Sequence, residues 1–279
     1  MPKMFDNPEW SNGNFHPTPT PSAVLNCAAS LYGPSSLEKF RIVKPSTHLL
    51  RILVVCMLCA PLPAQRKPSN GNVVFPPERV PNLGKVKQLL KDYHDCRCRC
   101  GCYAAEMNKQ ARRAMAFLER RAAARRPREK LAIVLDIDET SLSTYQFRET
   151  TDLGYIPSLF DQWVRSAQAP AIESTLRLFQ KARQLQVAVF FISARREALR
   201  AATQQNLQTQ GYAGWSGLVL RPMEDNSRSI AEFKSSARQG IADQGYRIIV
   251  NVGDQVSDLS GEPAAELSVK LPNPFYFIP

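Results

Sequence analysis

Three short apolar runs in the C-terminal two thirds of the chain constrain its fold more than any other feature. They are LAIVL at 131–135, VAVFFIS at 187–193 and RIIVNVGD at 247–254. Such runs are typical of parallel strands that helices cover on both faces. Shorter runs, GLVLR at 217–221 and LSVKLP at 267–272, predict two more strands.

Segments with helical spacing of apolar residues separate these strands. They cover residues 80–95, 103–126, 169–186, 194–212 and 229–246. Pro127 closes the second of these helices, and Gly211 and Gly245 end the last two. Alternation of strand and helix predicts an α/β fold with a doubly wound, Rossmann-like parallel sheet over residues 80–279.

The first 75 residues have a different composition. They are rich in Pro, Ser, Asn and Thr, which predicts a disordered extension. Within it, about residues 43–64 resemble a secretory signal, with an apolar run from Ile52 to Ala60 behind Lys44 and Arg51, and cleavage near Ala64. The run is shorter than the roughly 20 residues of a spanning helix. We therefore expect export, periplasmic, secreted or to the cell envelope, with membrane contact only through this segment; a buried hydrophobic segment is the alternative.

Basic residues gather in one region of a chain whose net charge is +11. The cluster, ARRAMAFLERRAAARRPREK, covers residues 111–130. A solvated helix face is the favoured interpretation, and a patch for anionic molecules or surfaces is the alternative. Because no nucleic-acid motif accompanies the charge, we expect no nucleic-acid partner.

Four of the seven cysteines alternate along one short segment, at Cys96, Cys98, Cys100 and Cys102. Cysteines two residues apart do not easily pair, so the segment is not a disulfide framework. A thiolate site for Zn or Cu(I) is one hypothesis, and a local irregularity of the loop is the other.

Polar side chains follow the predicted strands where each one ends. Asp136 and Asp138 follow the first, Ser193 ends the second, and Asp254 ends the third with Asp258 four residues later. Ligands of open α/β sheets bind outside the carboxyl ends of the strands. Several carboxylates at one edge repel each other unless a cation lies between them. Mg²⁺ prefers oxygen ligands and pairs with phosphate, so the pattern predicts a magnesium-assisted phosphate site.

Four motifs in order resemble the haloacid dehalogenase (HAD) superfamily. They are DIDETSLSTY, FFISARRE, EFKSSAR and NVGDQVSDLSG, beginning at residues 136, 190, 232 and 251. The chain is similar in particular to the secreted acid phosphatase branch, which includes plant vegetative storage proteins and bacterial class B and class C acid phosphatases. GYAGWSGLVLRP and KLPNPFYFIP are also similar to this branch. The resemblance implies a Mg²⁺-dependent phosphomonoester hydrolase that acts on a small phosphorylated substrate.

The resemblance also implies roles for the acids. Asp136 matches the nucleophile that forms an aspartyl-phosphate, and Asp138 matches the general acid and base. The Mg²⁺ would be held by the Asp136 side chain, the backbone carbonyl of Asp138 and Asp254, with Asp258 acting through water. Retention of Asp136 argues for an active enzyme, whereas storage-type relatives can lose it.

Three further residues match the phosphate-binding positions of the family. Ser193 would hydrogen-bond the phosphoryl oxygens, Lys234 would neutralise them and steady the nucleophile, and Arg195 would help to hold the substrate. Ser193 is also a helix N-cap candidate.

A small helical cap is expected over about residues 145–180, between the first two motifs. Its aromatic residues are Tyr145, Phe147, Tyr155, Phe160 and Trp163. At least half of them would form the core of the cap, while others could stack on a substrate. The identity of the phosphomonoester and the oligomeric state stay open. A non-catalytic storage or binding protein on the same fold is the alternative function, and transfer of phosphate to an alcohol is a variant of the first.

Overall fold

A computed structural model describes residues 80–96, 102–224 and 229–278. The chain divides into two units, Met1–Pro77 and Glu78–Pro279, and all described residues belong to the second. The expected N-terminal extension and signal-like segment therefore lie outside the described residues, as do Cys98 and Cys100. Among the described helices, none combines the length and apolar character needed to cross a membrane.

Five parallel strands form one sheet in the order β3-β2-β1-β4-β5. Their bounds are β1 Lys130–Leu135, β2 Ala188–Arg196, β3 Gly217–Arg221, β4 Tyr246–Gly253 and β5 Leu267–Lys270. The expected doubly wound α/β fold is confirmed. The strand order reverses direction between β1 and β4, which is where open α/β sheets bind ligands.

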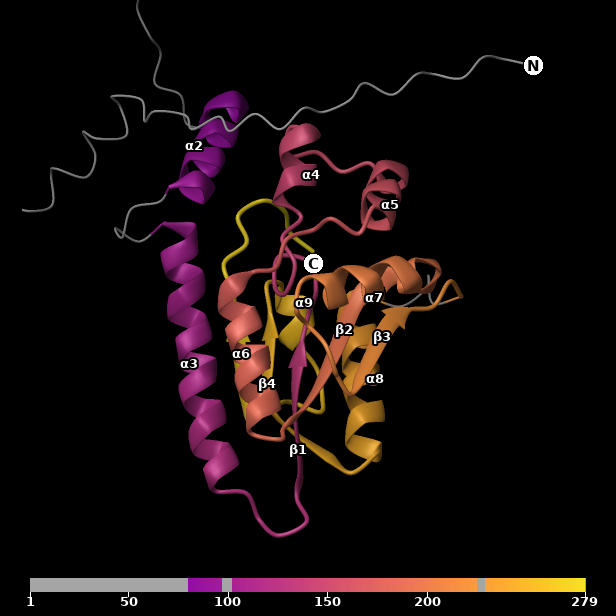
Figure 1. Cartoon of the computed structure of the whole chain (residues 1–279). Helices are drawn as coiled ribbons and strands as arrows, with labels where there is room; N and C mark the ends of the chain where they lie inside the picture. The colour runs from indigo at the N-terminus through magenta and orange to yellow at the C-terminus, as the bar shows by residue number, and fades with distance from the viewer. Residues whose placement is uncertain (1–79, 97–101, 225–228, 279) are drawn as a thin grey trace, which may run out of the picture. The chain divides into compact units, whose positions relative to one another are not determined.

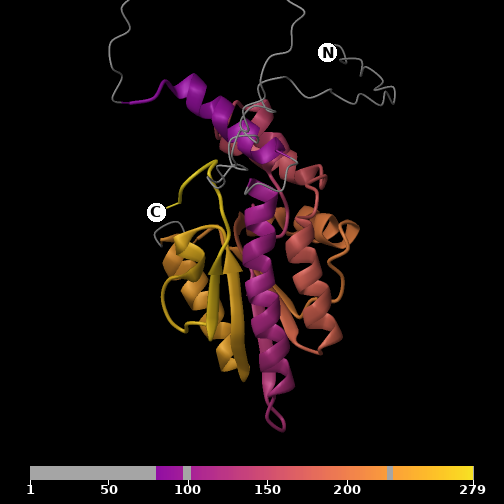
Figure 2. The same cartoon turned by 90° about the vertical axis from the view of Figure 1, so that its left-hand side faces the viewer.

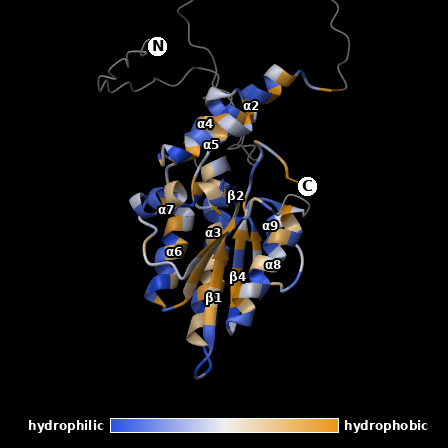
Figure 3. Cartoon of the chain, turned by 90° about the vertical axis from the view of Figure 1, so that its right-hand side faces the viewer, coloured by the Kyte–Doolittle hydropathy of each residue, from blue (hydrophilic) through white to orange (hydrophobic). Residues whose placement is uncertain are grey.

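Helices cover both faces of the sheet (Figure 2). Leu131, Ile133 and Leu135 of β1 join a large core cluster with α3 (Tyr103–Ala123), α6 (Glu173–Gln184) and α7 (Arg200–Thr209). Ala132 and Val134 join a smaller cluster with α8 (Ile230–Asp243) on the other face. Because alternate strand residues point to opposite faces, an all-apolar strand fits this two-sided burial. Figure 3 shows the resulting apolar sheet centre.

A cap of two short helices, α4 (Tyr145–Thr150) and α5 (Pro157–Arg165), lies beyond the carboxyl ends of the strands (Figure 1). Phe147, Phe160 and Trp163 pack together with Leu199, so these aromatic residues form a small core of their own. The expected cap range extended to about residue 180. Since α6 packs against α3 and β2, we place the end of the cap before Glu173.

The helix expected over residues 194–212 begins only at Arg200. Strand β2 continues to Arg196, which pairs with Arg221 after a register shift, and a 3₁₀ turn covers Glu197–Leu199. The irregular strand end thus occupies positions that helical spacing alone assigned to a helix. As a result, Arg195 lies on the sheet edge beside Ser193.

The N-terminal helix α2 (Leu83–Asp95) contains no buried residue. Its N-cap, Asn82, accepts a hydrogen bond from the Gly84 amide at 2.9 Å. At its other end the His94 ring stacks on Tyr145 with centroids 3.4 Å apart.

Within the basic cluster at residues 111–130, Arg121 pairs with Glu129 and Glu266. Part of the positive charge of the basic cluster is therefore neutralised by acidic residues of the same domain.

Asn206 of α7 fixes the chain where it leaves the cap. Its Oδ1 accepts from the Ala169 amide at 3.0 Å, and its Nδ2 donates to the Ala169 carbonyl at 2.8 Å. Both residues are buried, with 1% exposure each. The side chain therefore satisfies two backbone groups that water does not reach.

We predict that Asn206→Ala lowers the free energy of unfolding by about 3 kcal/mol, because two buried polar groups lose their partners. Urea unfolding followed by circular dichroism measures this change. Gln208→Ala, at an exposed position of the same helix, serves as the control. A loss below about 0.5 kcal/mol in Asn206→Ala, the usual range for surface substitutions, would contradict the role given to the amide.

Candidate active site

The expected acids meet at the carboxyl edge of the sheet. Asp136 follows β1, and Asp254 and Asp258 follow β4, with Asp258 in the short helix α9 (Val256–Leu259). One carboxylate oxygen from each lies within 4.8 Å of the others, and all three residues are buried. Strand ends far apart in sequence thus build one acidic cluster.

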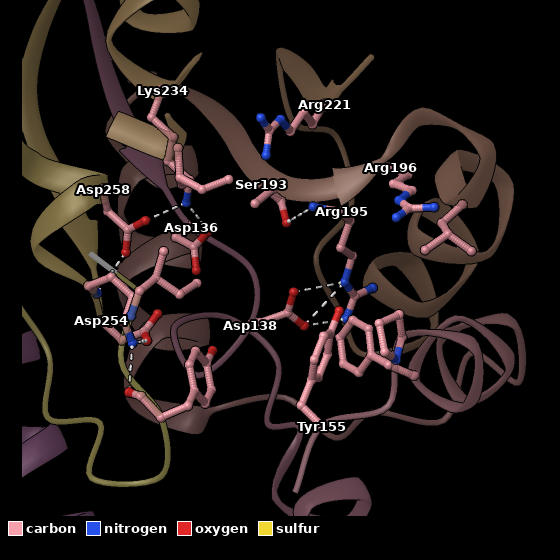
Figure 4. A pocket seen from close by; sticks show the side chains of 18 of the residues that line it. Asp136, Asp138, Tyr155, Ser193, Arg195, Arg196, Arg221, Lys234, Asp254 and Asp258 are labelled. Carbon is pink, nitrogen blue, oxygen red and sulfur yellow. Dashed lines mark hydrogen bonds and ion pairs between the residues drawn. The ribbon is translucent and has the colours of Figure 1, made fainter. Parts of the chain in front are cut away.

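Lys234 of α8 reaches into this cluster. Its Nζ bonds the Oδ1 atoms of both Asp136 and Asp258, and its side chain is 4% exposed. Figure 4 shows the ammonium group between the two carboxylates. Burial alone would lower the pKa of Lys234, but the charges of its two partners raise it. The lysine therefore stays charged and holds the two acids together.

Burial is the main cause that raises the pKa of Asp136, and Asp258 and Asp254 add to it while Lys234 opposes it. The pKa of Asp254 is raised by burial and by Asp258, and lowered by hydrogen bonds from Asn273 and Gln255. One cation faces three carboxylates, so negative charge is in excess. Hard oxygen donors with excess negative charge fit a divalent cation such as Mg²⁺.

The three acids differ in what their oxygens already bind. Asp254 accepts hydrogen bonds from Thr140 at 3.1 Å, Gln255 at 2.6 Å and Asn273 at 2.7 Å. Asp258 accepts a hydrogen bond from Lys234 on one oxygen and, at 2.8 Å, from the backbone N–H of Gln255 on the other. Asp136 Oδ2 accepts no hydrogen bond from the described residues. It is the carboxylate oxygen best placed to meet a ligand.

Asp138 lies apart from the acid cluster and pairs with Arg195. The Arg195 Nη2 lies 2.7 Å from Asp138 Oδ1, and its Nε lies 3.1 Å from Oδ2. Arg195 Nη1 also donates to Thr203 at 3.2 Å, and its side chain is 1% exposed against 18% for Asp138. The structure places the guanidinium of Arg195 on Asp138, and the expected contact of Arg195 with phosphate stays a prediction.

Ser193 lies at the end of the straight part of β2, where its Oγ accepts from the Arg195 amide at 3.2 Å. It lines the same cavity as Asp136, Asp138 and Lys234. The cavity has a volume of about 420 Å³. The structure therefore brings all the expected site residues to one cavity, with Arg195 turned toward Asp138.

The loop after Asp136 owes its shape to a buried acid that sequence analysis left without a role. Glu139 has φ +54°, and its carboxylate accepts from the Thr144 amide at 2.6 Å and the Thr144 hydroxyl at 2.8 Å. Burial and the charge of Asp254 raise the pKa of Glu139 to about 7. Ser141 donates to the Asp136 carbonyl at 2.6 Å. These bonds fix the loop that carries Asp136 and Asp138.

Gly253 allows β4 to pass close to the acid cluster. A Cβ atom at this position would lie 2.3 Å from the Cβ and 2.4 Å from the Oδ2 of Asp258. A side chain there would displace Asp258. Glycine is thus required by close approach and not by an unusual φ.

Several residues of the cavity escaped sequence analysis. Arg148 and Arg196 line it from the cap and the end of β2, and Tyr276 lines it from the segment after β5. Asn273 in that segment contacts Asp254. The ending KLPNPFYFIP was similar to the branch as a whole, but no local pattern placed it beside the acids.

The cysteine hypothesis falls partly outside the described residues. Cys102 Sγ donates to the Cys96 carbonyl at 3.0 Å, and burial is the main cause that raises the pKa of Cys102. Cys98 and Cys100 are not described, so a thiolate metal site stays a prediction.

Three plant proteins and one solved structure are similar to this chain. Acid phosphatase 1 of Solanum lycopersicum is 37% identical over 52% of the chain and 58% of its own length. The stem 28 kDa glycoprotein of Glycine max is 35% identical over 53% of the chain and 61% of its own length. Vegetative storage protein 1 of Arabidopsis thaliana is 30% identical over 52% of the chain and 55% of its own length. The chain thus spans little more than half the length of these relatives.

The class C acid phosphatase from Bacillus anthracis, solved with tungstate bound, has a TM-score of 0.57 and 21% identity, covering 70% of this chain and 86% of that one. At this identity the likeness shows the fold alone. The family model for HAD superfamily subfamily IIIB, acid phosphatase, matches residues 64–279. The chain therefore belongs to the acid phosphatase subfamily IIIB of the HAD superfamily.

Proposed function

We propose that this chain is a Mg²⁺-dependent phosphomonoester hydrolase that acts through an aspartyl-phosphate on Asp136. The observation that carries the proposal is the buried cluster of Asp136, Asp254 and Asp258 with Lys234 bound between two of them. Family membership supports the reaction class. Asp136 and Asp254 would hold Mg²⁺ with the Asp138 carbonyl, and Asp258 would act through water. When bound, Mg²⁺ supplies positive charge against the developing charge of the phosphoryl oxygens.

In the first step an oxygen of Asp136 attacks phosphorus, and the bond between phosphorus and the ester oxygen breaks. Lys234 opposes the rise in the pKa of Asp136 and directs its carboxylate, and Ser193 would donate to a phosphoryl oxygen. Asp138 gives its proton to the leaving oxygen. In the second step Asp138 takes a proton from water, which attacks phosphorus, releases phosphate and restores Asp136. Arg195 acts as a positioning residue, because its hydrogen bonds hold the Asp138 carboxylate beside the cavity.

We predict that Asp136→Asn lowers the turnover of p-nitrophenyl phosphate at least about 10³-fold, since the amide is a poor nucleophile. Release of p-nitrophenol, measured with Mg²⁺ present, tests this. Asp243→Asn, an exposed position of α8, is the control. If the folded wild-type chain hydrolyses none of a panel of phosphomonoesters, the non-catalytic storage or binding function replaces the phosphatase proposal. The storage and stem proteins among the relatives of the chain keep that alternative open.

We predict that Mg²⁺ stabilises the protein against unfolding, by about 2.7 kcal/mol when its concentration is 100 times Kd. The stabilisation should shrink as pH falls, because protons compete with the metal for Asp136 and Asp254, whose pKa values are raised. Thermal unfolding with Mg²⁺ or with EDTA, from pH 8 to pH 5, measures both effects. Equal stabilisation of Asp254→Asn and Asp243→Asn would argue against a metal at this cluster.

We also propose that the protein is exported. The support is the signal-like segment at about residues 43–64, and three of its relatives carry the name glycoprotein. Sequencing the N-terminus of the native protein tests the proposal. A first residue close after Ala64 is expected, and a mature protein that retains residues 43–64 would contradict cleavage there.

A further inference from the structure

Arg148 in the cap helix α4 is a buried cation without a carboxylate partner among the described residues. The residue is 5% exposed and lines the cavity. Two other buried basic residues line the cavity: Arg195 pairs with Asp138, and Lys234 pairs with Asp136 and Asp258. A buried charge without a partner is costly, so it is usually neutralised by a second charge.

The hydrogen bonds of Arg148 leave most of its donors without an acceptor. Its guanidinium group has five N–H donors. Within the described part of the chain, its one hydrogen bond runs from Nη1 to the Gly154 carbonyl at 3.4 Å. Its Nε is buried and has no partner. Arg148 therefore has fewer hydrogen-bond acceptors than an arginine in a structural ion pair. This lack of acceptors is typical of an arginine that binds an anionic ligand.

Aromatic rings surround the guanidinium and hold it in place. Its central carbon lies 4.2 Å from the ring centroid of Tyr276, 5.3 Å from Tyr155 and 5.8 Å from Phe147. Such contacts stabilise a cation through the ring faces. They do not use the N–H donors in the guanidinium plane, so the Nη2 donors, which make no hydrogen bond to the described residues, stay available to an oxygen ligand.

A second cation stands nearby. Arg196 is exposed at the end of β2 and lines the same cavity. Figure 4 shows it on the same side of the cavity as Arg195. The charges of Arg148 and Arg196 both oppose the rise in the pKa of Tyr155 that burial and Asp161 cause, so the phenol lies in the field of both. Asp161 and Asp138 also line the cavity and act on Tyr155, so an anion here would face these two acids as well.

We infer that the cavity contains a second anion site, centred on Arg148 and separate from the phosphoryl position at Asp136, and that preferred substrates carry a second anionic group on the leaving group. This inference rests on the proposed phosphatase function. Guanidinium groups bind carboxylate and phosphate through paired hydrogen bonds, and both groups supply the oxygens that Arg148 lacks. A cavity of about 420 Å³ has room for a small phosphomonoester that carries a second anionic group.

The test compares three phenyl phosphates that differ only in the para substituent, which is a carboxymethyl group, its uncharged amide or a phosphonomethyl group, whose P–C bond the proposed reaction does not break. Phosphoglycolate and its amide form a second, shorter pair. We expect kcat/KM of wild type to favour at least one anionic probe over its amide by about tenfold to a hundredfold, the usual range for hydrogen bonds to charged groups. The carboxylate and phosphonate probes tell which anion is preferred.

Arg148→Met should reduce this ratio to about one, and Arg148→Lys should retain part of it. Each ratio compares kcat/KM for two probes of the same variant. A general loss of activity from a loosened cap lowers both values alike and therefore leaves the ratio unchanged. Arg165→Gln, which removes an exposed charge from the same cap, should keep the wild-type ratio. A wild-type ratio near one for every probe, or an unchanged ratio in Arg148→Met, would overturn the inference.

The same probes separate this inference from the proposed function. If wild type hydrolyses no probe, the phosphatase proposal fails, and calorimetric binding of the carboxymethyl probe and its amide decides about the anion site. Tighter binding of the acid that is lost in Arg148→Met supports the site. Equal binding of acid and amide rejects it.

Discussion

The ion pairs between Lys234 and the two acids Asp136 and Asp258 are the interaction on which the rest of the site depends. Three buried carboxylates within 4.8 Å of each other would repel strongly without a cation. The lysine comes from α8, so the packing of that helix against β2 and β4 sets the position of the charge. The fold and the chemistry are therefore coupled through one side chain.

The positions of the acids could be predicted because they follow from strand periodicity. Apolar runs ending at Asp136 and Asp254 indicate buried parallel strands, and parallel strands bring their carboxyl ends to one edge. Lys234 could not be found in this way, since its helical pattern is that of any surface lysine. It required the resemblance of EFKSSAR to a known family.

Other parts of the site depend on contacts that no local pattern encodes. The guanidinium of Arg195 lies on Asp138 because β2 continues past Ser193 with a register shift, and helical spacing cannot reveal such a shift. Asn273 reaches Asp254, and Tyr276 reaches the cavity, only because the chain folds back over the sheet edge after β5. Arg148 lies in the cap, where its burial depends on rings from three separate segments.

The close approach at Gly253 has a consequence for how such a protein could change its role. The three atoms nearest to an added methyl group would all belong to the side chain of Asp258, which is a member of the acid cluster and of none of the hydrophobic clusters. The first effect of such a substitution would therefore fall on the acids and not on the apolar core. A gene encoding this fold could lose its chemistry through one substitution and still produce an abundant, well-folded protein.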